Sequence, residues 1–343
     1  MKEIELSTYL SKVGLNETNL RNLSPVERLN AIYLAHILTF PYSNIKLRQQ
    51  GSQHPLQRNL YLADYKNVFS EPSGGYCYQL AVLLKDILIK FEYQVDACEA
   101  RVLMGAEVNA TKILKFPPTH LVLKVTIEGQ SYFLDPGLSS QAPRLPILVS
   151  GNYEPVIQSP DEFRFYYLEE EKLYVLERRT ENGWLTLIQT NLSPLKQDKI
   201  ESNLMKLVQH FPTLAIRDDS LFMGRILPQG RRSLFWFAAT NQLKYTEKTT
   251  IGYEEKVLED YDEAVQVVDD KFNIKTTPEE LKQSCTSNKD KKGFLFFNHK
   301  PEHPWTVDFP LDKRTILSMR SKLVSNDIKD ELNDDVLSVR SNP

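Results

Sequence analysis

Apolar side chains recur at helical spacing through the first 92 residues of the chain. One apolar face begins directly after Ser24 and Pro25, and a second runs from Cys77 to Leu88. Serine followed by proline is typical of a helix start, because the serine oxygen accepts a first-turn N–H and proline lacks the N–H that would stay unused. The pattern therefore predicts a helical region over residues 1–92.

From residue 93 onward the apolar positions alternate with polar ones, which is the pattern of strands that bury one face. Strands are predicted over residues 93–103, 120–127, 131–134, 162–168, 172–178 and 184–189. The turn residues Glu128-Gly129-Gln130 separate the second strand from the third and predict a hairpin. This succession of strands indicates a sheet or a barrel.

After residue 195 the chain contains both helical spacing and strand-like alternation of apolar residues. Helices are predicted over residues 197–210 and 253–272, and strands over residues 221–227 and 233–239. The second of these helices is predicted to be amphipathic and rich in acidic residues. After Cys285 the composition shifts to Ser, Asn, Lys and Asp, which indicates a separate C-terminal extension over residues 291–343.

Composition and charge narrow the possible functions. The chain has 343 residues, of which 41% are hydrophobic and 25% charged, as in globular proteins of two or three domains. The formal net charge is −3, so we expect no general attraction to nucleic acid or to an anionic membrane. The best apolar run, residues 81–89, is too short to cross a bilayer.

The cysteines bear on the compartment. Cys77, Cys98 and Cys285 are an odd and sparse set, so at least one thiol is free and a reducing compartment is favoured. The opening residues 1–10 carry acidic side chains where a secretion signal has basic ones. We therefore expect a cytoplasmic protein. His299 and His303 have the spacing of zinc ligands, but Pro301 lies between them and no second pair is near, so no metal site is predicted.

The sequence Ser73-Gly74-Gly75-Tyr76-Cys77 places a cysteine directly after a glycine pair and at the start of a predicted helix. Paired glycines allow a sharp bend and a close approach to a ligand. The amides and dipole of a helix start favour a thiolate over a thiol. These features predict a nucleophilic cysteine, although a small buried apolar residue would show the same pattern.

A nucleophilic cysteine needs a base, and the base needs a group that orients it. His120 begins one strand of the predicted hairpin, and Asp135 follows the other. Both side chains are then expected at one edge of the sheet, where His120 could contact Asp135 on one side and Cys77 on the other. The alternative reading of each is a polar residue of a surface turn. Cys98 and Cys285 lack the turn and helix context and are not predicted to be nucleophiles.

Five blocks in order resemble those of the arylamine N-acetyltransferases. The three catalytic blocks of that family are similar to Gly74–Gln79, Thr119–Leu123 and Leu134–Gly137. The segment from Ala35 to Ile45 is similar to the family's His-x-x-x-x-Pro-Phe-Glu-Asn-Leu block, and Phe211–Thr213 with Gly224–Arg231 is similar to a later strand pair. The resemblance covers residues 5–285.

This resemblance implies an α+β fold of three units with an extension. A helical N-terminal domain bearing the nucleophile would cover residues 1–92, a central β-barrel 93–195, an α/β lid 196–290 and the extension 291–343. Cys77, His120 and Asp135 would lie at the junction. The reaction implied is a two-step transfer of acetyl from acetyl-CoA, through acetyl-cysteine, to an aromatic amine or hydrazine. No metal is implied.

Further site residues are implied by the same resemblance. Gly137, Ser139 and Thr213 would contact coenzyme A, and Phe116 with Pro117 would lie beside the acceptor. Thr213 could equally be a hydroxyl that satisfies its own backbone. Arg231 and Arg232 could meet phosphates, but a charged turn is usually solvated, which is the interpretation we favour.

The sequence departs from the family at three places. Ser73 and Ser43 stand where the family usually has Arg and Glu. If those two charges form one buried pair, their joint loss leaves no unpaired charge. The loop after the aspartate is shortened to Gly137-Leu138-Ser139-Ser140, which bears on how the coenzyme pyrophosphate approaches. Residues past 290 have no counterpart.

Two other functions are compatible with the same residues. A cysteine amidase or a transglutaminase-like enzyme uses the same triad on a peptide amide. A non-catalytic binding scaffold would explain the serine substitutions and the extension. The sequence alone leaves these alternatives open.

Overall fold

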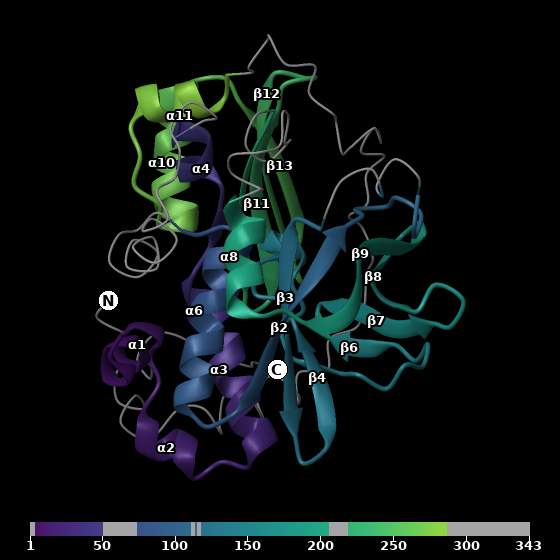
Figure 1. Ribbon diagram of the computed structural model, residues 1–343. Helices are drawn as coiled ribbons and strands as arrows, with labels where there is room; N and C mark the ends of the chain where they lie inside the picture. Colours follow the sequence, from purple (N-terminus) through teal and green to yellow (C-terminus); the bar gives the residue numbers. More distant parts are fainter. Residues whose placement is uncertain (1–3, 51–73, 111–113, 115–117, 206–218, 287–343) are drawn as a thin grey trace, which may run out of the picture.

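The computed structural model describes residues 4–50, 74–110, 114, 118–205 and 219–286. Its helices are α1 (Leu6–Val13), α2 (Glu17–Arg21), α3 (Pro25–Thr39), α4 (Ile45–Gln50), α6 (Cys77–Lys90), α8 (Gln197–Met205), α10 (Tyr261–Phe272), α11 (Pro278–Ser284) and the 3₁₀ turn η1 (Ser139–Gln141). The helices α1, α2, α3 and α6 gather at one side of the molecule (Figure 1). The helical region predicted over residues 1–92 is confirmed in its described parts, except that Tyr42–Ser43 form the short strand β1, which pairs with a later strand.

An eight-stranded antiparallel sheet follows and curls into a nearly closed barrel (Figure 1). Its strands are β2 (Gln94–Val102), β3 (His120–Ile127), β4 (Gln130–Leu134), β5 (Ile147–Leu148), β6 (Val156–Gln158), β7 (Asp161–Leu168), β8 (Leu173–Thr180) and β9 (Gly183–Pro194). The order β5-β4-β3-β2-β9-β8-β7-β6 leaves β5 and β6 at the edges. The Gln158 side chain joins these edges, because its amide accepts from Leu145 N and donates to Leu145 O, each at 2.9 Å.

The predicted strands between residues 93 and 189 are confirmed, including the hairpin of β3 and β4. Glu128 and Gly129 both have positive φ, 50° and 80°, as a two-residue hairpin turn of the primed type requires. Helix α6 packs against β2 and β3, so its apolar face and the inner face of the barrel share one core. This packing fixes the start of α6 against the strand that begins at His120.

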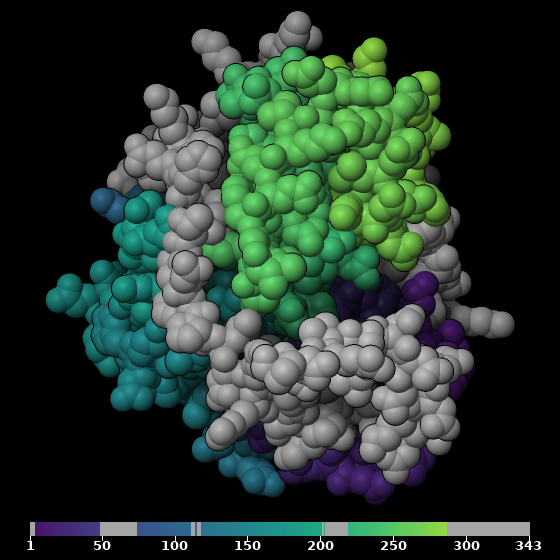
Figure 2. All heavy atoms as spheres, turned by 180° about the vertical axis from the view of Figure 1, so that it is seen from behind, coloured from purple at the N-terminus to yellow at the C-terminus, as the bar shows by residue number. Residues whose placement is uncertain are grey.

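A second sheet has the order β1-β10-β11-β12-β13, and all its neighbours are antiparallel. Its strands are β1 (Tyr42–Ser43), β10 (Ser220–Leu227), β11 (Gly230–Phe237), β12 (Gln242–Thr249) and β13 (Tyr253–Leu258). Helices α10 and α11 cover one face and enclose a second apolar core. This α/β unit is the lid, drawn in green to yellow at the top of both views, with the barrel in teal beside it (Figures 1 and 2).

The helix predicted over residues 253–272 is wrong in its first part. Residues 253–258 form β13, whose Glu255 pairs with Lys244 of β12 at 2.7 Å. Asp260 then caps α10, because its side chain accepts the Asp262 N–H at 3.0 Å. Pairing with β12 overrides the helical pattern, and β12 itself was not predicted. The predicted helix 197–210 is confirmed as far as Met205, and its end lies outside the described residues.

The α+β fold with a helical N-terminal part, a barrel and an α/β lid is confirmed, while the exact domain boundaries stay a prediction. Residues 291–343 and the pair His299 and His303 lie outside the described part of the chain. No helix that the structure describes has the length and apolar composition needed to cross a membrane.

Asn44 ties the N-terminal region to the lid. Its side chain accepts the Phe222 N–H at 2.7 Å and donates to Ser220 O at 2.9 Å, and it is completely buried. We expect Asn44→Ala to remove both hydrogen bonds and to lower the free energy of unfolding by roughly 1–3 kcal/mol. Urea unfolding measures this. The exposed Asn191 of β9 accepts the N–H of Ser193, two residues further on, so Asn191→Ala is the control for a local hydrogen bond. Equal stability of the two variants would contradict the role of Asn44.

Candidate active site

Cys77 is the first residue of α6 and is 3% exposed. The Tyr76 N–H donates to the Gln79 side-chain oxygen at 3.0 Å, which closes the first turn. Gly74 has a φ of 63°, and a Cβ there would lie 2.8 Å from Pro41 O, so this position requires glycine. The helix start therefore presents the thiol where first-turn amides and the helix dipole favour negative charge.

His120 is the first residue of β3, and Asp135 directly follows β4. The hairpin pairs Leu123 with Leu134 and so brings the two polar residues to one edge of the barrel. His120 Nε2 lies 2.7 Å from Asp135 Oδ2, and both residues are buried. Asp135 Oδ1 accepts the Gly137 N–H at 3.0 Å. Both carboxylate oxygens are thus used, and the carboxylate is fixed in orientation.

The imidazole of His120 interacts with Cys77 as well as with Asp135. Burial alone would lower the pKa of His120, but the Asp135 carboxylate and the Cys77 sulfur raise it to about 10. At neutral pH the ring is therefore a positively charged imidazolium, with a proton on each nitrogen. Cys77 Sγ also lies 3.8 Å from Thr119 O. The structure thus brings together Cys77, His120 and Asp135, the three residues that the sequence predicted as a triad.

Gly137 packs directly on the nucleophile candidate. A Cβ at Gly137 would lie 2.5 Å from Cys77 Cα and 2.6 Å from Cys77 Cβ, so no side chain fits there. Ser139 lies against the lid, because its hydroxyl oxygen occupies the space where a Cβ on Gly224 would be. The shortened loop after Asp135 is therefore held between α6 and β10.

Two tyrosines that the sequence did not single out complete this site. The Tyr33 hydroxyl lies 3.1 Å from Asp135 O and 2.9 Å from Pro143 O, so it links the two ends of the loop. Burial raises the pKa of Tyr42, and the nearby Cys77 raises it further, so its hydroxyl stays protonated. Tyr42 stands where the family block has Phe, which was the one signal available in the sequence. Tyr33 had none beyond its helical position.

The other sequence candidates are distributed as follows. Four of these candidates lie outside the described residues, namely Thr213, Phe116, Pro117 and Ser73. Ser43 is buried, and its hydroxyl accepts the Ile45 N–H at 3.3 Å. The prediction that Ser43 and Ser73 compensate for one another stays a prediction.

The remaining thiols and one histidine differ from the site residues. Burial raises the pKa of both Cys98 and Cys285 to about 12, so both stay protonated at neutral pH. His36 is completely buried against Tyr9, whose hydroxyl lies 3.1 Å from its Nδ1, and burial lowers its pKa to about 3. His36 is therefore neutral and serves the packing of α1 on α3.

The prediction that Arg231 lies in a solvated turn is wrong. It is 4% exposed and pairs with Asp161 of the barrel. The reason is the tertiary packing of the lid on the barrel, which encloses the start of β11. Arg232 pairs with Glu247 of the next strand at 3.1 Å.

Within residues 4–50, 74–110, 114, 118–205 and 219–286, no three His, Cys, Asp or Glu side chains are placed to hold a metal ion together. The chemistry that the described residues offer is that of an imidazole in contact with a thiol and with a carboxylate. Such an arrangement can form a covalent thioester and can move one proton in each direction.

Comparison with known proteins identifies the family. The N-acetyltransferase family model matches residues 25–281. The pineal gland isozyme NAT-10 of arylamine N-acetyltransferase from Gallus gallus is 27% identical over 288 residues, covering 79% of this chain and 94% of that protein. Arylamine N-acetyltransferase 1 from Homo sapiens is 25% identical with the same coverage of both chains, 79% and 94%.

Solved structures agree with the fold. The structure of arylamine N-acetyltransferase from Mycobacterium marinum in complex with CoA aligns with a TM-score of 0.69 at 20% identity, covering 82% of this chain and 98% of that one. The enzyme from Salmonella typhimurium aligns with a TM-score of 0.68 at 19% identity, covering 83% and 99%. Since the family model spans well over half of the sequence, the chain belongs to the arylamine N-acetyltransferase family and is an acyltransferase.

Proposed function

We propose that this protein transfers the acetyl group of acetyl-CoA to a small aromatic amine or hydrazine in two steps, through a thioester on Cys77. The observation that carries the proposal is the buried hydrogen bond of 2.7 Å between His120 and Asp135, with Cys77 in contact with the same imidazole. Family membership supports the transfer of acetyl groups in general. The Mycobacterium marinum relative was solved with CoA, which supports a coenzyme A thioester as donor.

In the first proposed step the Cys77 sulfur attacks the thioester carbonyl. A carbon–sulfur bond to Cys77 forms, the bond to the coenzyme sulfur breaks, and the imidazolium of His120 gives its proton to the departing thiolate. Amides at the start of α6 are placed to stabilise the oxyanion that develops beside Cys77. Coenzyme A then leaves before the acceptor enters.

In the second proposed step the amine nitrogen attacks the acetyl carbon on Cys77. The carbon–nitrogen bond forms, His120 accepts the proton of the amine, and the bond to Cys77 breaks to return the thiolate. Asp135 binds Nε2 of the His120 ring, so Nδ1 is the nitrogen that exchanges the proton with the amine. The cycle therefore ends with the thiolate and imidazolium with which it began.

Gly137 and Ser139 are proposed to contact coenzyme A, because both lie on the loop between Asp135 and the lid, next to Cys77. Thr213 is proposed for the same ligand, and Phe116 and Pro117 for the acceptor, on the family resemblance alone. We also propose a cytoplasmic location, in keeping with three free cysteines.

We expect incubation with acetyl-CoA to increase the intact mass by one acetyl group, and an added arylamine to remove it. Cys77→Ala should gain no acetyl group, because the attacking sulfur is absent. Cys98→Ala should behave like the wild type, since that thiol is buried in β2 and stays protonated. Intact-mass spectrometry measures all three. Amide hydrolysis without an adduct would favour a cysteine amidase, and binding of coenzyme A without an adduct would favour a scaffold.

We expect Asp135→Asn to slow acetylation of Cys77 by roughly 10³-fold or more, since the imidazole loses the group that orients it and stabilises its charge. The pKa of His120, about 10 in the wild type, should fall in the variant. Its folded pKa lies above the unfolded value of 6.5, so the stabilisation it provides is complete below pH 6.5 and is lost as the pH rises through about 10. NMR titration of the His120 ring and urea unfolding at several pH values measure both effects.

Asp96→Asn is the matched control for this experiment. Asp96 pairs with Lys124 at 3.1 Å on the outer part of the same barrel and is only half-buried. Its removal should leave the titration of His120 and the acetylation rate unchanged. An unaltered His120 titration in Asp135→Asn would contradict the assigned pair.

A further inference from the structure

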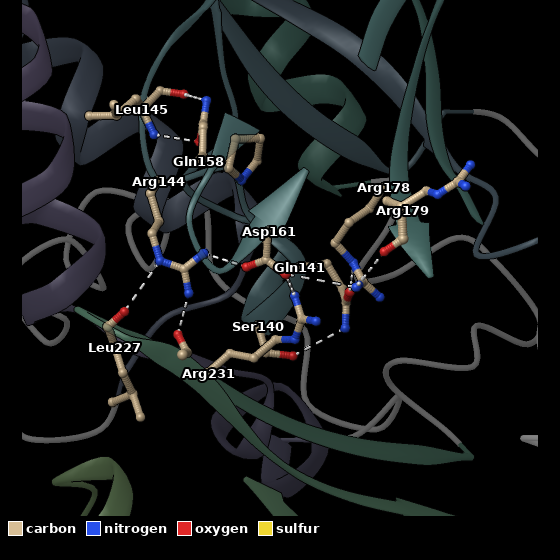
Figure 3. Close-up of polar contacts among 12 residues, drawn as sticks. Ser140, Gln141, Arg144, Leu145, Gln158, Asp161, Arg178, Arg179, Leu227 and Arg231 are labelled. Carbon is tan, nitrogen blue, oxygen red and sulfur yellow. Dashed lines mark hydrogen bonds and ion pairs between the residues drawn. The ribbon is translucent and has the colours of Figure 1, made fainter. Parts of the chain in front are cut away.

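A carboxylate outside the triad lies among three buried guanidinium groups. Asp161, the first residue of β7, is surrounded by Arg144, Arg178 and Arg231, and we call these four residues the Asp161 cluster (Figure 3). All four are at most 7% exposed. They come from the barrel strands β7 and β8, the lid strand β11 and the loop before β5. The cluster therefore lies where the lid meets the barrel.

The contacts within the cluster are charge-assisted. Asp161 Oδ2 accepts from Arg144 Nη1, Oδ1 accepts from Arg231 Nη1, and Arg178 Nη1 lies 3.8 Å from Oδ1. Burial alone would raise the pKa of Asp161, but the arginines, Arg231 foremost, lower it well below its usual range. The carboxylate is thus ionised, and it offsets the repulsion among three buried cations.

Arg144 connects this cluster to the lid. Its Nη2 donates to Gly230 O and its Nε donates to Leu227 O at 3.3 Å, so one guanidinium binds both sides of the turn between β10 and β11. The same residue ends the loop that begins at Asp135. We call residues 135–144 the aspartate segment.

The aspartate segment is held at both ends and in its middle. Tyr33 links its ends through Asp135 O and Pro143 O. In its middle, Gln141 Oε1 accepts from Arg178 Nε at 2.9 Å, and the hydroxyls of Ser140 and Ser233 are 2.6 Å apart. The segment is thus held by the barrel through Arg178 and by the lid through Ser233.

The aspartate segment packs against Cys77 without free space between them. Gly137 lies within the aspartate segment, and even a Cβ there would lie 2.5 Å from Cys77 Cα. A shift of the segment must therefore move Cys77, or separate it from the carboxylate that orients His120. Misplacement of about 1 Å by a distant mutation can cost roughly 100-fold in rate.

We propose that Asp161 is a positioning residue for acetyl transfer: through Arg144 and Arg178 it holds the aspartate segment, and with it Asp135 and Gly137, in register with Cys77. This inference rests on the proposed function. Asp161 touches neither Cys77 nor His120, so its effect passes through the two arginines. A cluster that only joined the lid to the barrel would change stability and leave the site geometry unaltered.

The test compares Asp161→Asn with Glu177→Gln. Glu177 is a second buried barrel carboxylate, paired with Arg164 of β7 and linked to none of the aspartate segment. We expect Asp161→Asn to slow acetylation of Cys77 by roughly 10- to 100-fold per folded molecule and to shift the His120 titration. Glu177→Gln should lower the melting temperature only. Asp161→Glu should restore most of the rate, because it returns the charge.

Gln141→Ala is a second test of the proposal, to be used if Asp161→Asn does not fold. It removes the bond to Arg178 and leaves the Asp161 cluster in place, so we expect a smaller loss of rate, about threefold, with little change in melting temperature. Wild-type rate and His120 titration in folded Asp161→Asn, or in Gln141→Ala if only that variant folds, would overturn the proposal. If the wild type forms no acetyl-cysteine, the proposed function fails. The His120 titration of the same variants still decides whether Asp161 positions the site.

Discussion

The close packing of Gly137 on Cys77 is the contact on which the site depends. The turn after β4 lies directly on the start of α6, and nothing larger than hydrogen fits between them. Because Asp135 comes two residues earlier and accepts the Gly137 N–H with one oxygen, the same turn aims its other oxygen at His120. One backbone bend therefore determines both where the sulfur lies and how the imidazole is held.

The lid is connected to the nucleophile by a strand of two residues. Gly75, two positions before Cys77, accepts the Ser43 N–H at 2.9 Å, and β1 in turn pairs Tyr42 with Gly224 of β10. The helical region thus contributes an edge strand to the lid sheet. Through this link the lid sheet, whose other strands come after residue 219, contacts the segment that leads into Cys77.

The interior of this chain places serine at one position and a cluster of charges at another. Ser43 is buried where the family usually has Glu, and its hydroxyl is satisfied by a local amide. Buried charge gathers at the junction of lid and barrel, where Asp161 meets three arginines. Buried ions need partners to offset their lost hydration, so such a cluster favours one particular arrangement of the two units.

Local patterns in the sequence were sufficient for the helix that starts at Cys77 and for the hairpin of β3 and β4. The three residues that meet in the site needed, in addition, the ordered blocks that resemble the family. Each depends on short-range spacing, on turn residues or on ordered motifs. The strand β13 depends on its pairing with β12, the strand just before it. The burial of Arg231 and the contacts of Tyr33 and Asp161 depend on partners far away in the chain. Register between distant strands and the burial of a charge are decided by which surfaces meet, and only tertiary packing brings those surfaces together.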